Sequence, residues 1–494
     1  MSNLSDLLPS GGGQNIVDFT ASGTVASGKP VVLNANGTVS EVALTSTSKG
    51  SVNTWQSGAY SSASMTYDAN AGKSVIFYRD SNNSNYGTAA VISVSGTTVS
   101  VGTPVVFASA NIYNGTMGGS ATYDSNAQKV IYAYLDFSDV NPITGQGKTK
   151  SIVGTVSGTS ISFGSPTSLE SENADSSVKL TFDSTRNKVI AVYRNASQSG
   201  RGEARVGTIS GTSCSWESSN VFQSSSIQYP SVAYDSDADR CLITYQSQGA
   251  HSNKGIGVVA SNNGTQLTYY SDTVFSGTDT VTTSAVVYDS VQKAMVIAYR
   301  SGSSGSTGNV VSGTISGNAV TFGSSTEVES GTYVLFEGAF DSTSNKSVFV
   351  YRDGNNSNYT TLTIATVSGT SVTASETFLV DSVNGNPSNV AFDAGAGQCV
   401  VAYTDSSKYA VAVTVSSTNL SATNFLGLAD AAISDTATGK INVKGSINSK
   451  QSSLTIGSDY YVQSDGSVST TSTSPAQKIG QAVTATTINM MDLT

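Results

Sequence analysis

The feature that most constrains this chain is a repeated segment in which an aspartate and a tyrosine keep a fixed spacing. The first copy, M-T-Y-D-A-N-A-G-K-S-V-I-F-Y-R-D, runs from Met65 to Asp80, and six further copies follow it. The tyrosine always lies ten residues after the aspartate, although successive aspartates are 52 to 59 residues apart. A constant spacing within units of variable length indicates one rigid piece per unit, with the variation in loops. The pairs are Asp68 and Tyr78, Asp124 and Tyr134, Asp183 and Tyr193, Asp235 and Tyr245, Asp289 and Tyr299, Asp341 and Tyr351, and Asp393 and Tyr403.

Each repeat reads as four strands. A short strand ends at the aspartate, an apolar run such as Val189 to Tyr193 follows a tight turn, and a third strand ends in V-S-G-T or I-S-G-T before a fourth. No segment has a convincing helical period. Seven units of four antiparallel strands predict an all-β fold, a seven-bladed β-propeller over residues 48–424. We expect Asn419 to Leu426 to supply the fourth strand of the last blade, and closure by a strand from the N-terminus is the alternative.

The two ends of the chain carry related hairpins. Gly28 to Ser40, G-K-P-V-V-L-N-A-N-G-T-V-S, aligns without gaps on Gly457 to Ser469, G-S-D-Y-Y-V-Q-S-D-G-S-V-S. Because domain termini often lie close together, an exposed loop can accept a whole inserted domain. Residues 16–47 and 425–494 are therefore predicted to form one small split β-barrel or sandwich domain that carries the propeller. Residues 1–15, which contain three consecutive glycines, are predicted to be a flexible tether.

Composition excludes several classes of partner. Charged residues make up 12% of the chain and the net charge is -10, so a phosphate backbone has no basic surface to bind and nucleic acid is not expected as a partner. The sequence contains no run of about 18 apolar residues, so no membrane-spanning helix is predicted, and the N-terminus has no secretory signal pattern. Three cysteines without a C-x-x-C spacing, of which Cys241 and Cys399 occupy apolar repeat positions, predict neither a disulfide framework nor a metal site. We expect no cofactor.

Recognition residues are expected on one face of the propeller. The turns between strands 1 and 2 and strands 3 and 4 are nearly constant, whereas the loops on the opposite face vary in length and content. Variable loops on a rigid scaffold commonly carry binding residues. Asparagine amides beside exposed aromatic rings suit a neutral polyhydroxyl ligand such as a glycan, although Asn-rich loops are also ordinary turns. The candidate ligand-binding residues are Trp55, Tyr60, Asn82, Asn83, Tyr86, Tyr113, His251, Asn355, Asn356 and Tyr359.

Catalytic and metal-binding alternatives find less support in the sequence. Asp235, Asp237 and Asp239 resemble the start of a calcium loop, but Arg240 stands where such a loop requires glycine, which favours a polar hairpin turn. A single histidine, His251, leaves little room for a His-based triad. The repeat arginines lie in separate blades, and the S-x-D-x-G-x-T-W boxes of sialidase-like propellers are absent. We therefore predict no enzymatic activity and no catalytic residues, with glycosidase chemistry through paired carboxylates left open.

The segments that flank the repeats resemble structural proteins of tailed, particularly marine, bacteriophages. The N-terminal M-S-N-L-S-D-L-L-P-S-G-G-G-Q-N and its following hairpin resemble the starts of such proteins. The segment F-L-G-L-A-D-A-A-I-S-D-T-A-T-G-K-I-N-V-K-G and the Y-Y-V-Q-S-D-G-S-V-S hairpin are similar to a small β domain of phage tail-fibre and head-decoration proteins. In that family the F-L-G-L segment follows shortly after the first hairpin, whereas here the repeats intervene.

The resemblance implies a virion structural protein, assembled in the host cytoplasm and exposed on the particle. We expect an external appendage such as a tail fibre that binds host-surface glycan, present as a homo-oligomer or in multiple copies. Its other partners would be virion proteins, contacted through the tether and the small β domain. The alternatives are an architectural capsid-decoration or head-fibre protein, and a polysaccharide-degrading propeller enzyme.

Overall fold

The chain folds into two compact units. The computed structural model describes residues 15–112, 119–140, 147–170, 178–249, 251–302, 306–330, 333–385, 388–421, 423–472 and 477–490. Unit 1 comprises Met1–Ser46 and Ser416–Thr494, and unit 2 comprises Thr47–Val415. Among the described residues the protein is all-β with several antiparallel sheets, and its one helical element is a 3-10 helix, η2 (Ala196–Gln198). No described helix is long and apolar enough to cross a membrane.

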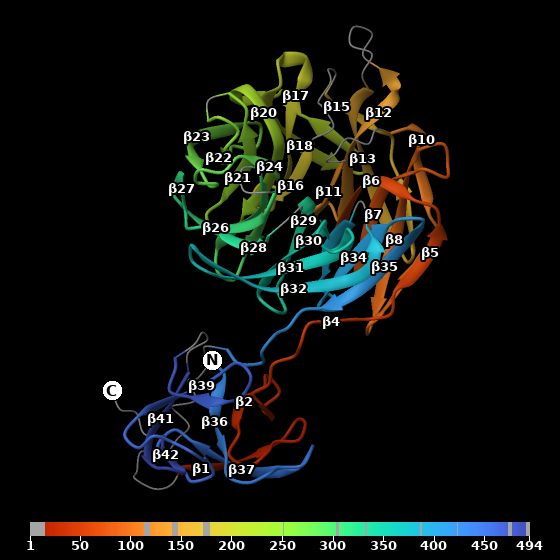
Figure 1. Ribbon diagram of the computed structural model, residues 1–494. Helices are drawn as coiled ribbons and strands as arrows, with labels where there is room; N and C mark the ends of the chain where they lie inside the picture. Colours follow the sequence, from red (N-terminus) through yellow and green to blue (C-terminus); the bar gives the residue numbers. More distant parts are fainter. Residues whose placement is uncertain are drawn as a thin grey trace. The chain divides into compact units, whose positions relative to one another are not determined.

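Unit 2 is built from the repeats, and Figure 1 shows its sheets side by side. The first repeat contains β6 (Tyr60–Asp68), β7 (Lys73–Asp80), β8 (Tyr86–Ser95), β9 (Thr98–Val101) and β10 (Val105–Asn111). The second contains β11 (Ser120–Asp124), β12 (Lys129–Val140), β13 (Gly147–Ser157), β14 (Ser160–Phe163) and β15 (Thr167–Glu170). The third and fourth share one eight-stranded sheet with β16 (Lys179–Asp183), β17 (Lys188–Asn195), β18 (Arg201–Ser210), β19 (Ser213–Trp216), β20 (Asn220–Asp235), β21 (Arg240–Ser247), β22 (Gly255–Asn262) and β23 (Leu267–Val274).

The remaining repeats follow the same plan. The fifth contains β24 (Val281–Asp289), β25 (Ala294–Ser301), β26 (Gly308–Ser316), β27 (Ala319–Phe322) and β28 (Thr326–Glu329). The sixth contains β29 (Tyr333–Asp341), β30 (Lys346–Asp353), β31 (Tyr359–Ser368) and β32 (Ser371–Asn384). The seventh contains β33 (Ser388–Asp393), β34 (Gln398–Thr404) and β35 (Ser407–Thr414), joined by β4 (Ser48–Lys49) and β5 (Asn53–Ser57). We call the strand that ends at the repeated aspartate the inner strand of its repeat. Inner strands of successive repeats contact one another, and β33 also contacts β6.

The repeated aspartate organises the turn after each inner strand. Asp68 Oδ1 accepts the backbone N–H groups of Asn70 (3.0 Å) and Ala71 (2.9 Å). The same two bonds recur at Asp124, Asp183, Asp235, Asp289 and Asp341, and Asp393 keeps the second of them. All seven carboxylates are buried. The aspartate therefore fixes the hairpin by satisfying backbone donors, which explains its constancy.

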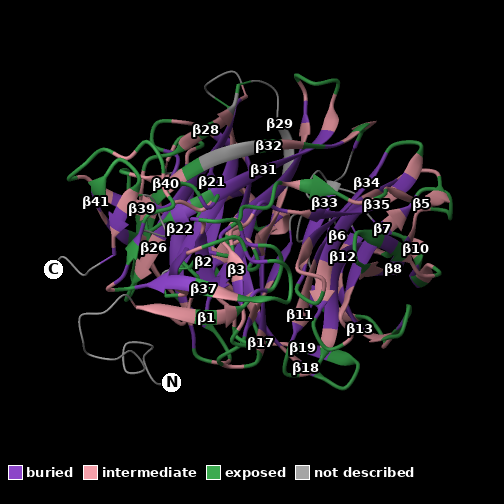
Figure 2. Cartoon of the chain, turned by 90° about the horizontal axis from the view of Figure 1, so that it is seen from below, coloured by how far each residue is buried: buried purple, intermediate pink, exposed green. Residues whose placement is uncertain are grey.

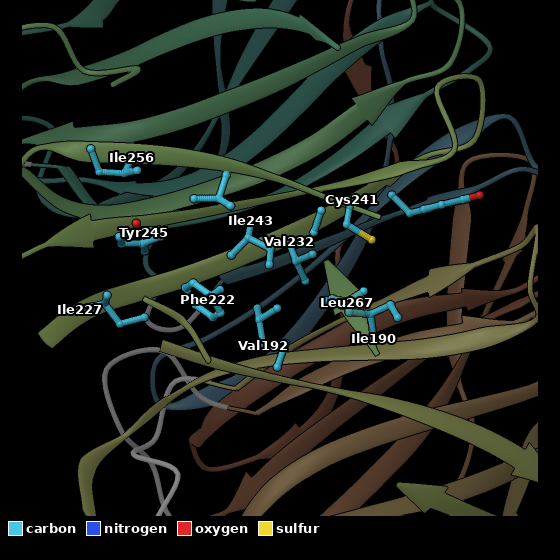
Figure 3. Packing of buried hydrophobic residues seen from close by; sticks show 14 of the residues in the cluster. Ile190, Val192, Phe222, Ile227, Val232, Cys241, Ile243, Tyr245, Ile256 and Leu267 are labelled. Atoms are coloured by element: carbon cyan, nitrogen blue, oxygen red, sulfur yellow. The ribbon is translucent and has the colours of Figure 1, made fainter. Parts of the chain in front are cut away.

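The repeated tyrosine is a core residue. All seven tyrosines are at most 2% exposed, so each repeat places a large side chain between neighbouring sheets. Figure 3 shows one such layer, in which Ile190 and Val192 of β17 lie near Ile243 and Tyr245 of β21. Figure 2 shows the same division over the chain, with buried strands and exposed connections. Burial of this many apolar side chains is the main force that holds the sheets together.

The last sheet of unit 2 corrects one expectation. Asn419 to Leu426 was expected to form its fourth strand, and this is wrong, because β36 (Phe425–Ala429) pairs with strands of unit 1. The N-terminal strand β5 takes the position instead and pairs with β35, with Thr54 opposite Tyr409. At the break in this outer strand, Gly50 occupies the place that Gly102 occupies in the first repeat.

Unit 1 consists of two five-stranded sheets with the same topology. The first has the order β1-β37-β36-β2-β3 and the second β38-β42-β41-β39-β40, so each strand of one sheet has an equivalent in the other. The hairpins also share a register, since Val32 pairs with Ser40 and Tyr461 pairs with Ser469. The first sheet contains β1 (Ile16–Thr20), β2 (Pro30–Leu33), β3 (Val39–Glu41), β36 and β37 (Thr438–Val443). The second contains β38 (Ile447–Asn448), β39 (Asp459–Val462), β40 (Val468–Ser469), β41 (Gln477–Thr484) and β42 (Thr487–Asn489).

This correspondence identifies unit 1 as an internal duplication. Unit 2 leaves the first copy between β3 and β36, which corresponds to the connection between β40 and β41 in the second copy. The two sheets share a core that includes Val32, Leu428, Tyr460 and Ile488. Most of the predicted tether lies outside the described residues; Asn15 Nδ2 donates to the Lys444 carbonyl (3.0 Å).

Candidate functional site

The loop between β7 and β8 holds three of the predicted binding residues, Asn82, Asn83 and Tyr86. Asp80 Oδ1 accepts the Asn82 backbone N–H (3.1 Å), and Asn82 Nδ2 donates to the Ser57 carbonyl (2.9 Å). The Asn82 amide therefore ties its loop to the segment before β6 and is used internally. Asn83 is exposed and its side chain has no hydrogen bond to another described residue, while Tyr86 is half-buried.

The equivalent loop of the sixth repeat has the same construction. Asp353 Oδ1 accepts the Asn355 backbone N–H (2.9 Å), and Asn355 Nδ2 donates to the Ser330 carbonyl. Asn356 is exposed, without a side-chain bond to a described residue, and Tyr359 is half-buried. In both loops the first asparagine is structural, and the second has an exposed amide without a hydrogen bond to a described residue.

The predicted aromatic platform before β6 is mostly buried. Tyr60 is 1% exposed, and its ring lies 5.4 Å from that of Tyr78. The expectation that Tyr60 contacts a ligand on the surface is therefore wrong, because the side chain turns into the core that the repeat tyrosine forms. Trp55 is half-buried and packs edge-on against the same Tyr78 ring at 5.6 Å.

A buried lysine holds this region together. Lys408 Nζ donates to the carbonyls of Ser57 (3.3 Å) and Gly58 (3.1 Å) and lies 3.3 Å from Asp80 Oδ1. The Lys408 side chain is fully buried and its ammonium lies 5.8 Å from the Tyr78 ring centre. Burial lowers the pKa of Lys408, and the Asp80 carboxylate opposes this. Lys408 of β35 thereby connects the last repeat to the first.

His251 belongs to a third, separate group. Its Nε2 lies 3.5 Å from Asp272 Oδ2, which also accepts a bond from Gln223 (3.4 Å) and one from the Tyr245 hydroxyl (3.4 Å). Burial raises the pKa of Tyr245, so its hydroxyl stays neutral. Tyr113 lies outside the described residues. Within the described residues, no hydrogen bond, ion pair or ring contact joins the three groups of predicted site residues.

The structure brings a different set of residues together, in a cavity of about 130 Å³ that we call the inner-strand cavity. Every inner strand of unit 2 contributes two adjacent residues, the first of them four positions before the repeated aspartate. The lining residues are Ser64, Met65, Ser120, Ala121, Lys179, Leu180, Ser231, Val232, Ala285, Val286, Glu337, Gly338, Asn389 and Val390.

Polar contacts cross this cavity and connect its walls. Lys179 Nζ forms a 2.6 Å ion pair with Glu337 Oε1, although the two residues are 158 positions apart. Ser64 Oγ accepts the Ala121 backbone N–H (3.0 Å), and Ser120 Oγ accepts that of Leu180 (3.0 Å). Each of these hydroxyls therefore links its own inner strand to the next one.

Bulges aim several of these side chains. The register of β6 against β7 shifts between Ser61 and Ser64, and the shift in β29 lies between Val334 and Glu337. A comparable shift in β20 ends at Ser231. A bulge re-aims the residue that follows it, and here that residue lines the cavity in each case.

Sequence reasoning missed the inner-strand cavity, although a signal was available. The position four residues before the aspartate reads Ser64, Ser120, Lys179, Ser231, Ala285, Glu337 and Asn389 through the seven repeats. A repeat position that is otherwise uncharged but carries one lysine and one glutamate indicates a paired, specialised use. Lys179 and Glu337 were not connected because neither has a local motif.

Other sequence candidates have structural roles. Asp237 forms an ion pair with Lys293 of the next repeat (2.8 Å) and Asp239 accepts from the Tyr234 hydroxyl (2.8 Å), so both carboxylates are engaged by other side chains. No group of three or more His, Cys, Asp or Glu side chains in the described ranges is placed to hold a metal ion. The three cysteines are buried and free. Burial raises the pKa of Cys214 to about 12, which leaves its thiol unreactive.

Comparisons with known proteins give only distant likenesses. No protein-family model and no curated protein matches the chain. A protein of unknown function from Dyadobacter fermentans is 9% identical with a TM-score of 0.43, covering 73% of this chain and 98% of its own. A polysaccharide lyase of an ulvan-lyase family is 11% identical with a TM-score of 0.47, covering 82% and 98%.

A sialidase of Trypanosoma rangeli is 11% identical with a TM-score of 0.39, over 81% of this chain; the chain spans about 59% of the sialidase. These neighbours include two enzymes. At such identities and TM-scores, the likenesses support no statement about the activity or ligand of this chain, and the expected lack of enzymatic activity stays a prediction.

Proposed function

We propose that unit 2 is a seven-bladed β-propeller closed into a ring by the N-terminal strand β5. One contact supports the closure. In three pairs of successive repeats, a glycine at the break in the outer strand lies so close to the S-G-T turn of the next repeat that a Cβ would overlap a threonine carbonyl. The same overlap is found between the last repeat, at Gly50, and the first, at Thr97. The four pairs are Gly50 and Thr97, Gly102 and Thr159, Gly164 and Thr212, and Gly323 and Thr370.

We infer that the chain is a virion structural protein of a tailed phage, an external appendage that presents this propeller to host-surface glycan. The two ends of the chain, which resemble phage structural proteins, support the virion assignment. Insertion of unit 2 into one copy of a duplicated β unit supports separate functions for the two units. Unit 1 and the tether attach the protein to other virion proteins, and unit 2 is displayed.

The observation that carries the binding proposal is the matched pair of loops after β7 and β30. In each, internal hydrogen bonds fix the loop while Asn83 or Asn356 is left exposed with an unused amide. An amide both donates and accepts, which suits the vicinal hydroxyls of a sugar. The mechanism is binding without chemistry, in which weak contacts are multiplied by the copies on the particle.

A glycan array probed with the full-length protein tests this proposal. We expect binding to a defined set of glycans, weakened by Asn83→Ala and Asn356→Ala. Asn126→Ala is the matched control, because Asn126 is equally exposed but lies in a hairpin of the constant set. Absence of binding to any glycan or host cell would favour the architectural alternative, and turnover of host polysaccharide would favour the enzymatic one.

A further inference from the structure

The inner-strand cavity carries an inference that does not depend on the proposed glycan binding. We propose that this cavity is a binding site for a small carboxylate. The class of ligand follows from the hydrogen-bonding groups that line the cavity, from their burial and from the path by which solvent reaches them.

Serine and lysine side chains supply hydrogen-bond donors to this cavity. Ser64, Ser120 and Ser231 each accept a backbone N–H from the next inner strand, at 3.0, 3.0 and 3.3 Å. None of the three hydroxyls donates its own hydrogen to another described residue. A lysine ammonium has three donors, and the bond to Glu337 uses one of those of Lys179. The lining thus holds several donors without partners, which is the arrangement that an acceptor-only group such as a carboxylate requires.

Asn389 is the second, independent observation. It is 1% exposed, lines the cavity, and its Nδ2 and Oδ1 have no hydrogen-bond partner among the described residues. The Tyr60 hydroxyl lies within reach of the Asn389 side-chain amide. One hydroxyl can satisfy at most one of the two N–H groups of that amide. A buried amide without partners is costly, so such a group marks a place where a guest or ordered water binds.

Size and access fit a small guest. A cavity of about 130 Å³ has the volume of roughly four water molecules in the liquid, enough for a carboxylate with one or two carbons. The Glu337 side chain is 31% exposed and that of Lys179 is 10% exposed, so solvent reaches the cavity on the glutamate side. A guest carboxylate would then share the Lys179 ammonium with Glu337.

This sharing makes an unusual prediction about Glu337. In an ion pair that only joins two strands, removing either charge has an effect of the same sign, because both charges stabilise the same contact. If a guest carboxylate competes with Glu337 for Lys179, removing the glutamate charge strengthens guest binding, whereas removing the lysine charge weakens it. The opposite signs separate a ligand site from an ion pair that only joins two strands.

The test is calorimetric titration of the full-length protein with sodium acetate, with sodium chloride at equal ionic strength and neutral acetamide as control ligands. A ligand of four heavy atoms reaches tens of micromolar at best, so we expect a millimolar Kd for acetate. Lys179→Met should weaken acetate binding at least about tenfold, and Glu337→Gln should tighten it several-fold, because one charge of a competing pair is removed. Lys293→Met, which removes an exposed ion pair with Asp237, should leave the Kd unchanged.

Four outcomes would overturn the proposal: no saturable acetate binding by the folded wild-type protein, equal heats with acetamide, unchanged acetate affinity in Lys179→Met, or unchanged or weaker binding in Glu337→Gln. If Lys179→Met does not fold, the Glu337→Gln result alone decides, because that substitution keeps the side-chain shape.

Discussion

Replacement of Lys408 by methionine is the most informative perturbation of unit 2. The lysine side chain is fully buried, its partner Asp80 is 4% exposed, and the two atoms lie 3.3 Å apart. Methionine keeps the apolar stem of the side chain, one atom shorter, while it removes the charge. The substitution leaves the Asp80 carboxylate buried without its counterion, and it removes the donor to the Ser57 and Gly58 carbonyls.

The expected cost follows from this burial. Removing one partner of a buried ion pair destabilises proteins by about 3–5 kcal/mol, against about 0–1 kcal/mol for an exposed pair. We therefore expect the free energy of unfolding of unit 2 to fall by about 3–5 kcal/mol in Lys408→Met. Lys293→Met is the control, since its ion pair with Asp237 is exposed, and its cost should be below about 1 kcal/mol.

Tryptophan fluorescence in a denaturant titration measures this cost selectively. The chain has two tryptophans, Trp55 and Trp216, and both belong to unit 2. The double variant Lys408→Met with Asp80→Asn should recover much of the lost stability, because no charge is then left buried alone. A loss below about 1 kcal/mol in Lys408→Met, or strict additivity in the double variant, would refute the claim that this pair fastens the last repeat to the first.

Four further predictions concern the fold and its pH dependence. Gly164→Ala should destabilise unit 2 by about 3 kcal/mol, because the new Cβ meets the Thr212 carbonyl. In the control Gly158→Ala the new Cβ meets no atom, so the cost should be only about 1 kcal/mol of backbone strain. Denaturant titrations compare the two variants. Deleting residues 1–57 should unfold or strongly destabilise unit 2, because β35 loses its partner. On the proposed virion role, deletion of residues 1–15 should leave the fold intact by circular dichroism and should abolish incorporation into particles. Burial raises the pKa of Asp289, so the folded state binds its proton more tightly than the unfolded state, and the stability from this group is lost as pH rises through the folded pKa. The stability of the Asp289→Asn variant relative to wild type should therefore be higher at pH 7 than near pH 4. Calorimetric melting at both pH values checks the sign. A stability difference that is the same at both pH values would contradict it.

The repeat could be predicted because its signals are local. Asp68 and its six equivalents need only the two following backbone amides to make their turn, so their role is readable from spacing. The repeat tyrosines end apolar runs such as Val189 to Tyr193, which indicates a core position before any partner is known. Tyr60 was misplaced because its partner, Tyr78, belongs to the neighbouring strand, and an aromatic residue beside a loop has the same local pattern whether it is buried or exposed.

The closing strand and the cavity depend on contacts between distant residues. Residues 48–57 and 419–426 are both short and strand-compatible, and what distinguishes them is that β5 pairs with β35 whereas β36 pairs with strands of unit 1. Lys179 and Glu337 come together because their repeats face each other across the cavity, which no local pattern encodes. The duplication within unit 1 was visible as a paired hairpin, but its full extent became clear only from the matching strand orders.

Hydrogen exchange along the outer strands tests the central claim, ring closure by the N-terminal strand, most directly. If β5 pairs with β35, a peptide covering residues 48–57 exchanges its amides as slowly as one covering residues 105–111, which form the equivalent outer strand of the first repeat. Rapid exchange of residues 48–57 beside protected residues 105–111 would contradict closure, and with it the ring on which the proposed display of binding loops depends.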